Sequence, residues 1–430
     1  MLITSRLKIL LTVLLFLVAV QTVSPWSIFP LGTTFLWWGI NLMVLIAIFR
    51  LKKNFYDAKS YHNLVIFLYL YWNIICIVRG VFIAENYWEW KNLFTMGFIL
   101  LLPLTIYISA NRLIVQLIFA QYIKYLLPAF VLFAVITDSL AWGVYLIPVS
   151  ILILFIPLLT KKWQTMVIVI ALFAATASLA ARSNVIKFVV PMALCSLYYA
   201  RPFVGKKMLS TIRILFLVLP MVLFVLGLTG QFNIFKISEY VEGDLTTTQS
   251  DGKQEDLTAD TRTGLYIEVI ASAIKNDYVL LGRTPARGND SVIFGAEIEG
   301  LTNTGKLERY TNEVSILNVF TWTGLIGVIL YFLIFMRATY LAIHKSNSWY
   351  MKILGVYIAF RWTYAWVEDF SRFDLSYILL WLLLGMCFST SFRNMTNLEF
   401  KYWVRGIFDV RYRNATLKKT RVVKIENNAS

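Results

Sequence analysis

Apolar stretches of about twenty residues recur along this chain, and short polar connections separate them. Each stretch is long enough to cross the hydrocarbon core of a bilayer as one α-helix. None shows the alternation over about ten positions that is typical of a transmembrane β-barrel. The pattern therefore predicts an all-α fold, a polytopic bundle of transmembrane helices.

We expect about twelve spans, with limits where an apolar stretch meets charged or turn-forming residues. We interpret the first as a retained span rather than a signal peptide, because residues 21–25 lack a clear small-x-small cleavage site. In chain order the expected spans cover residues 9–23, 31–49, 63–83, 92–109, 118–136, 140–159, 165–181, 184–200, 214–230, 314–336, 352–370 and 375–392.

Basic residues concentrate in alternate connections between these spans. With the N-terminus in the cytoplasm, the clusters 50–53, 161–162 and 201–213 all lie on the cytoplasmic side. The opposite connections are neutral or acidic, except for the single Arg182. Because membrane proteins retain Lys and Arg on the cytoplasmic side, we expect both termini there and residues 231–312 on the outer face.

Residues 231–312 form the one long hydrophilic segment between spans, with 13 Asp/Glu and 8 Lys/Arg. The sequence thus predicts four parts. Spans one to nine occupy 1–230, an extracytoplasmic catalytic loop 231–312, and spans ten to twelve 313–392. A basic cytoplasmic tail occupies 393–430, with 9 Lys/Arg against 3 Asp/Glu.

Composition excludes several classes of function. The chain is 59% hydrophobic and only 15% charged, so the net charge of +16 indicates retention of basic residues at a membrane rather than nucleic-acid binding. Its three cysteines lie in apolar stretches, and there is no CxxC, P-loop or Gly-rich dinucleotide motif. The sequence therefore predicts no metal and no cofactor.

Three arginines of the long segment, Arg262, Arg283 and Arg287, lie close together in sequence. Residues 261–274 predict a short amphipathic helix with Arg262 in its first turn and an Asp or Thr cap. A helix N-terminus presents free N–H groups, and an arginine adds a planar fork that grips phosphate. The cluster therefore indicates anion binding. The alternative for each arginine is that it balances the acidic residues of the segment.

Charges near the membrane give two further signals. Arg182 stands in a short outer turn, against the orientation bias. In span eleven, Arg361, Glu368 and Arg372 follow one another at spacings of 7 and 4, which places them on one helical stripe. A charge as deep as Arg361 is costly in lipid, so it forms an intramembrane ion pair, for example with Glu368, or lines a polar cavity.

Glu268 and Glu313 are the candidate general bases on the outer face. The histidines, His62 and His344, both fall on the predicted cytoplasmic side, so no outer histidine is available as a base. Asn312 precedes Glu313 where the chain re-enters the membrane.

These residues resemble motifs of the O-antigen polymerase and ligase group of polytopic glycosyltransferases, over roughly half the chain. Ala180–Ser183 resembles an outer Ser-Arg element, and Arg262 the arginine that opens the helix of the loop. Leu281–Gly288 is similar to the Pro/Gly turn after that helix. Asn312–Glu313 with Gly324–Gly327 resembles the loop exit before a Gly-x-x-Gly span. The ligase branch has a histidine at this exit, and its replacement here favours the polymerase branch.

The resemblance implies that the substrates are oligosaccharide repeat units on undecaprenyl pyrophosphate, at the outer face of a bacterial inner membrane. Arginines would hold the pyrophosphate leaving group without a metal. The catalytic residues implied or considered are Arg182, Arg262, Glu268 and Glu313. Those expected to bind substrate are Arg283, Arg287, Asn312, Arg361, Glu368 and Arg372. Membrane lipid, a chain-length regulator and a flippase are the expected partners.

Three other functions compete with a polymerase. A ligase of the same group would use the same donor, and a flippase for lipid-linked sugars also has about a dozen spans. A flippase needs charge along a central cavity, however, whereas this chain concentrates charge in the outer segment. A structural scaffold is the third alternative, and the membrane-embedded Arg361 speaks against it.

Overall fold

The computed structural model describes residues 5–55, 64–177, 182–233, 235–236, 246–248, 254–256, 260 and 262–413. Nearly all regular structure in these residues is helical. The helices are α1 (Ser5–Val23), α2 (Thr34–Phe55), α3 (Leu64–Ile83), α4 (Tyr87–Leu101), α5 (Arg112–Gln121), α6 (Leu127–Ile136), α7 (Ser139–Tyr145), α8 (Ile147–Ile153), α9 (Lys161–Thr176), α10 (Arg182–Tyr199), α11 (Lys206–Leu228), α12 (Thr263–Lys275), α13 (Gly295–Thr302), α14 (Ser315–His344), α15 (Trp349–Tyr364), α16 (Leu375–Phe388), α17 (Thr390–Arg393) and α18 (Asn397–Phe408).

Short non-α segments complete the fold. Strand β1 (Thr246–Thr248) pairs antiparallel with β2 (Gln254–Asp256), and β3 (Asn289–Asp290) pairs antiparallel with β4 (Glu308–Arg309). The remaining helical turns are η1 (Ser24–Trp26), η3 (Leu102–Ala110), the π-helical η4 (Tyr122–Leu126) and η5 (Ile156–Leu158).

The described residues include seven helical stretches that are long and apolar enough to cross a membrane. They are Leu7–Trp26, Thr34–Leu51, Leu64–Ile83, Tyr87–Ala110, Arg112–Ile136, Lys206–Leu228 and Ser315–His344. Ser183–Tyr199 and Leu375–Phe388 are shorter apolar helices. The fold is therefore compatible with a helical membrane protein, and the count of twelve spans stays a prediction.

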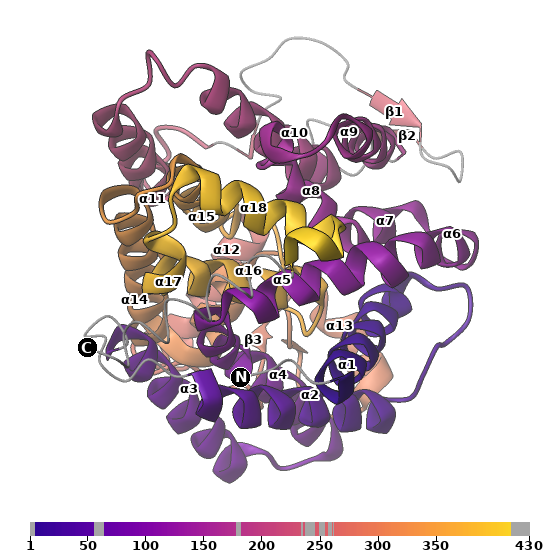
Figure 1. The fold of residues 1–430 in the computed structure, drawn as a ribbon. Helices are drawn as coiled ribbons and strands as arrows, with labels where there is room; N and C mark the ends of the chain where they lie inside the picture. The colour runs from indigo at the N-terminus through magenta and orange to yellow at the C-terminus, as the bar shows by residue number, and fades with distance from the viewer. Residues whose placement is uncertain are drawn as a thin grey trace.

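The centre of the bundle is where α14, α15 and α16 pack against one another. In Figure 1, α15 and α16 lie near the middle of the view and α14 at its left, with α1–α4 below and α9 and α10 above. Every residue of α16 except Ile378 is buried, and α14 packs extensively against α15. Tryptophans fill this centre: Trp322, Trp362 and Trp381 are fully buried. The outer helices expose apolar side chains such as Phe49 and Phe82, as expected where lipid replaces water.

Connections gather at two ends of the bundle. Residues 262–313 pack at one of these ends, which we call the loop end. There Arg79 of α3 donates to the carbonyl of Leu281 (2.6 Å). At the opposite end, α18 packs on α5, and Trp403 donates to the carbonyl of Arg112 (2.8 Å). Which of the two ends faces the cytoplasm stays a prediction.

Two glycines fasten the long segment to the membrane helices. α14 is broken at Gly324, where φ is +67°, and Gly282 also has a positive φ of +73°. The two backbones approach so closely that a Cβ on either would lie 2.4 Å from the other's nitrogen. The break leaves backbone N–H groups of α14 without an acceptor in the helix, and the long segment supplies one: Leu325 N–H donates to the carbonyl of Val279 (2.9 Å). This contact explains why both positions are glycine.

Candidate functional site

Arg262 links three parts of the chain at the loop end. It immediately precedes α12, whose start is held by Asp260 accepting from the backbone N–H groups of Arg262 (3.1 Å) and Thr263 (2.9 Å). The Arg262 guanidinium pairs with Glu313 at the start of α14 and lies 3.9 Å from the carboxylate of Glu368. The amphipathic helix expected over residues 261–274 is present, and its arginine faces the membrane helices.

Glu368 lies between two cations. Its carboxylate is 4.0 Å from the Lys187 ammonium of α10 and 3.9 Å from Arg262, and its side chain is 23% exposed. Glu368 lies beyond the end of α15. A partly exposed carboxylate placed between two cations is a candidate proton acceptor.

Arg361 is a buried cation with weak partners. It is 3% exposed, and its guanidinium makes only long hydrogen bonds of 3.5 Å, to the hydroxyls of Tyr357 and Ser376. Its Nε has no hydrogen-bond partner in the described part of the chain, and it stacks on the ring of Phe370 (4.3 Å). The alternative of an Arg361–Glu368 ion pair is therefore not realised.

The single helical stripe expected for Arg361, Glu368 and Arg372 is wrong. Helix α15 ends at Tyr364, so only Arg361 is helical. The chain leaves the helix because its carbonyls bond to α14 instead: Ile316 N–H donates to the carbonyl of Ala365 (3.0 Å). Glu368 and Arg372 lie on the irregular residues 365–374, which we call the 365–374 loop.

The 365–374 loop lies at the loop end and is largely enclosed by protein, with Arg372 as its one exposed residue. In a membrane protein, irregular backbone is tolerated where protein or a wet cavity surrounds it. Asp369 anchors this loop: it accepts from Ser371 N–H (2.8 Å), Asn318 (3.2 Å) and Arg372 (2.9 Å).

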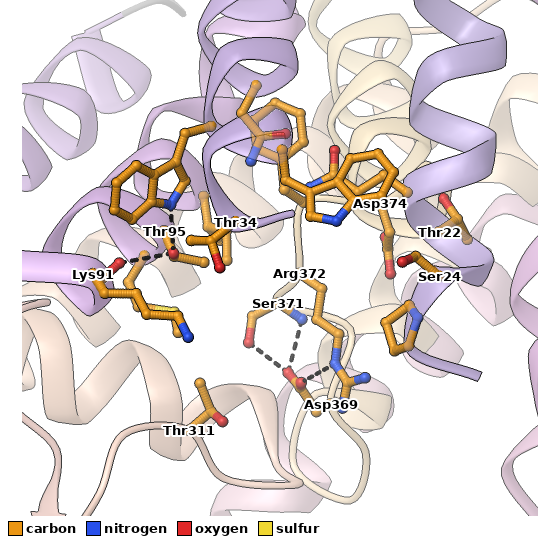
Figure 2. Close-up of a pocket in the computed structure, with 18 of the residues that line it drawn as sticks. Thr22, Ser24, Thr34, Lys91, Thr95, Thr311, Asp369, Ser371, Arg372 and Asp374 are labelled. Atoms are coloured by element: carbon orange, nitrogen blue, oxygen red, sulfur yellow. Dashed lines mark hydrogen bonds and ion pairs between the residues drawn. The ribbon is translucent and has the colours of Figure 1, made fainter. Parts of the chain in front are cut away.

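A cavity of about 370 Å³, lined by aromatic and polar side chains, borders the 365–374 loop (Figure 2). Figure 2 shows Asp369, Ser371 and Arg372 on this loop, with Lys91 and Thr311 to one side of the space. Its aromatic wall comes from Trp26 of η1 and from Trp37 and Trp38 near the start of α2. Asp374 also lines it, and burial raises the pKa of that carboxyl to about 6. The full lining is Gln21, Thr22, Ser24, Pro25, Trp26, Thr34, Trp37, Trp38, Asn41, Lys91, Thr95, Met96, Ile99, Thr311, Asp369, Ser371, Arg372, Phe373 and Asp374.

Arg283 and Arg287 are neutralised by carboxylates within the protein. Both pair with Glu308, which is 3% exposed, and Arg283 also pairs with Asp290 (2.7 Å). Glu89 of α4 lies 3.8 Å from Arg287. Burial works against ionisation of Asp290, but hydrogen bonds from Lys275 and Arg283 lower its pKa to about 2. The geometry of these two arginines therefore favours the alternative that they balance acids.

The two expected general bases, Glu268 and Glu313, differ in the hydrogen bonds and the exposure of their carboxylates. Both oxygens of Glu268 are occupied: they accept from Ser291 Oγ (2.7 Å) and from the N–H groups of Val292 (2.7 Å) and Ile293 (2.8 Å). This carboxylate caps a turn. Glu313 is 48% exposed, although it pairs with Arg262 and lies 3.3 Å from Arg309.

Asn312 is buried and is held by other amides. Its side chain donates to Asn289 Oδ1 (3.0 Å), and its backbone N–H donates to Asn318 Oδ1 (2.6 Å). Asn318 also contacts Asp369, so Asn312 belongs to the support of the 365–374 loop.

Arg182 is the first residue of α10, and its side chain lies outside the described residues. The next residue, Ser183, accepts a hydrogen bond on its carbonyl from Tyr364 (3.1 Å) at the end of α15. The backbone of the predicted outer turn is thus fastened beside Arg361 and Lys187.

Sequence reasoning missed the aromatic cavity and half of the charge network. Trp26, Trp37 and Trp38 had no special signal, because tryptophans are frequent at the ends of membrane helices. Lys187 is an isolated charge within an apolar stretch. An unpaired intramembrane lysine is itself a signal that a carboxylate lies nearby.

Comparison of the chain with protein-family models, with curated proteins and with solved structures gives no match.

Glu308 should be essential for the stability of the long segment. Glu308→Gln removes the charge that Arg283 and Arg287 share and leaves both guanidinium groups, 13% and 17% exposed, without their main partner. Breaking a buried ion pair from one side costs about 3–5 kcal/mol. The variant should unfold at a clearly lower temperature in a thermal-shift measurement. The exposed Glu297, replaced in the same way, should leave the midpoint unchanged; equal midpoints for both variants would contradict the structural role.

Proposed function

We propose that this chain is a glycosyltransferase that polymerises oligosaccharide repeat units carried on undecaprenyl pyrophosphate. The observation that carries the proposal is the gathering of Arg262, Lys187 and Arg361 around the 365–374 loop, at the end of the bundle where a lipid phosphate would lie. Buried cations are costly, and an anionic substrate that binds among them offsets that cost.

The proposed reaction needs one bond to form and one to break. A hydroxyl of the acceptor sugar attacks the anomeric carbon of the donor, and the bond from that carbon to pyrophosphate breaks. The electron pair leaves with undecaprenyl pyrophosphate, whose negative charge Arg262 and Lys187 stabilise. The proton of the hydroxyl passes to a carboxylate, for which Glu368 is better placed than Glu268, because Glu268 is saturated with hydrogen bonds.

Support for polymerisation over ligation comes from the loop exit. Asn312 and Glu313 occupy the place of the histidine that the ligase branch has. The described histidine, His344, ends α14 and bonds to Ser210 (3.1 Å), far along the helix from Glu313. In the proposed setting, the loop end faces outward from the inner membrane of a bacterium, a flippase supplies the repeat units and a chain-length regulator limits the product.

The purified chain in proteoliposomes should convert undecaprenyl-pyrophosphate-linked repeat units into a ladder of longer lipid-linked chains. The ladder should persist in EDTA, because the proposed stabilisation of pyrophosphate uses side chains rather than a metal. Lipid-linked products are resolved by electrophoresis after labelling of the sugar. Transfer of single units only to a lipid A core acceptor would identify a ligase, and movement of substrate between leaflets without new linkages would identify a flippase.

A further inference from the structure

We infer that the cavity beside the 365–374 loop binds a neutral saccharide of one or two rings, the sugar that supplies the acceptor hydroxyl. This assignment rests on the proposed function and deepens it. The volume of about 370 Å³ falls within the roughly 300–1,000 Å³ of small-ligand sites.

The aromatic wall suits a sugar ring. Trp26, Trp37 and Trp38 come from η1 and the first turn of α2, and all three line the cavity. An indole ring offers a flat apolar face to the C–H face of a pyranose. The ring of Trp37 packs on Gly32: a Cβ there would lie 2.7 Å from the ring.

The polar lining offers unused acceptors for sugar hydroxyls. Asn41 is 1% exposed, and its Oδ1 has no hydrogen-bond partner among the described residues; Gln21 Oε1 is likewise buried without a partner. A buried acceptor without a donor costs free energy comparable to a lost hydrogen bond, and a hydroxyl donor from a ligand would remove that cost. Hydroxyl groups of Thr22, Ser24 and Thr34 lie around the same space (Figure 2).

Charge in the cavity is balanced, which favours a neutral ligand. Lys91 and Arg372 carry positive charge, Asp369 and Asp374 carry negative charge, and Arg372 is paired with Asp369 (2.9 Å). The cationic cluster for the pyrophosphate lies across the 365–374 loop, because Glu368 contacts Lys187 and Arg262 while the next residue, Asp369, lines the cavity. The loop thus lies between the cationic cluster and the cavity, so that a pyrophosphate at the cluster and the reacting hydroxyl of a sugar in the cavity would meet at Glu368.

Saturation-transfer NMR on the full chain in nanodiscs tests this site without requiring turnover. The probes are the methyl glycosides of glucose, galactose, mannose, N-acetylglucosamine and N-acetylgalactosamine, and at least one should bind saturably. Trp37→Ala should weaken that binding about tenfold or more. Asn41→Leu should also weaken it, and should not lower the thermal midpoint, because it removes an orphaned acceptor.

Trp90→Ala is the matched control: Trp90 lies on α4, does not line the cavity and should leave binding unchanged. No saturable binding of any probe, or binding that survives both Trp37→Ala and Asn41→Leu, would overturn the inference. If the protein makes polymer, and Trp37→Ala and Asn41→Leu both extend limiting substrate at the wild-type rate, the inference is wrong and the proposed function stands. If the probes bind in the cavity but the protein makes no polymer, the proposed function is wrong and the saccharide site stands.

Discussion

Arg262→Ala should reduce chain extension at least about 10²-fold, the loss typical when one preorganised donor to a developing negative charge is removed. Arg262 is the cation that connects the start of α12 with Glu313 and Glu368. Without it, two carboxylates face the position proposed for the pyrophosphate, and they repel it. The measurement is the initial rate of ladder formation in proteoliposomes at saturating lipid-linked substrate.

Lys275→Ala is the matched control for Arg262, because Lys275 is a cation at the other end of the same helix and is 73% exposed. It should retain the wild-type rate. Arg262→Lys keeps the charge without the planar fork and should fall between the two. A wild-type rate in Arg262→Ala would refute the role of Arg262; equal loss in Lys275→Ala would show that any perturbation of α12 stops the reaction.

Helix α12 could be predicted from sequence because its causes are local. An apolar stripe and the capping Asp260 lie within a few residues of one another, and the structure has the helix at Thr263–Lys275. The alternation of apolar stretches and charged connections could also be recognised in the sequence, because a bilayer requires apolar residues along each membrane helix and leaves charges to the connections.

The end of α15 could not be predicted in this way. The sequence predicts that the helix continues to residue 370, yet α14 supplies N–H donors to the carbonyls of Ala365 and Glu368. Tertiary hydrogen bonds thus replace those of another helical turn. This one departure creates the 365–374 loop, and with it the cavity that the sequence did not indicate.

The sequence identifies the candidate arginines, but it does not predict which carboxylates pair with them. Arg262 and Arg287 have the same charge and both lie in the long segment, but Arg287 meets the buried Glu308 and Arg262 meets the partly exposed Glu313. Both cations pair closely with a carboxylate, and they differ in how buried that carboxylate is, which only the fold shows. A sequence can therefore nominate cationic residues for an anion site, and the fold selects among them.

Arg361→Met should stabilise the protein and stop chain extension. Arg361 is a buried charge with an unpartnered Nε and hydrogen bonds of 3.5 Å, so an apolar side chain of similar length removes a desolvation cost. On insertion scales that cost is about 2.5–3.5 kcal/mol, and a thermal midpoint a few degrees higher should result. Extension should fall at least about 10²-fold if the guanidinium stabilises the leaving group.

Arg393→Met separates these two effects. Arg393 is 6% exposed and also has a buried Nε without a partner, but it lies at the end of α17, at the opposite end of the bundle. Its replacement should raise the midpoint in the same way and leave the rate of extension unchanged. A lower midpoint in Arg361→Met would show that stacking on Phe370 makes Arg361 a structural residue. Unchanged extension would remove it from the proposed site. A stabilised and inactive Arg361→Met beside a stabilised and active Arg393→Met would mean that the chain retains a costly charge at the loop end because the reaction uses it.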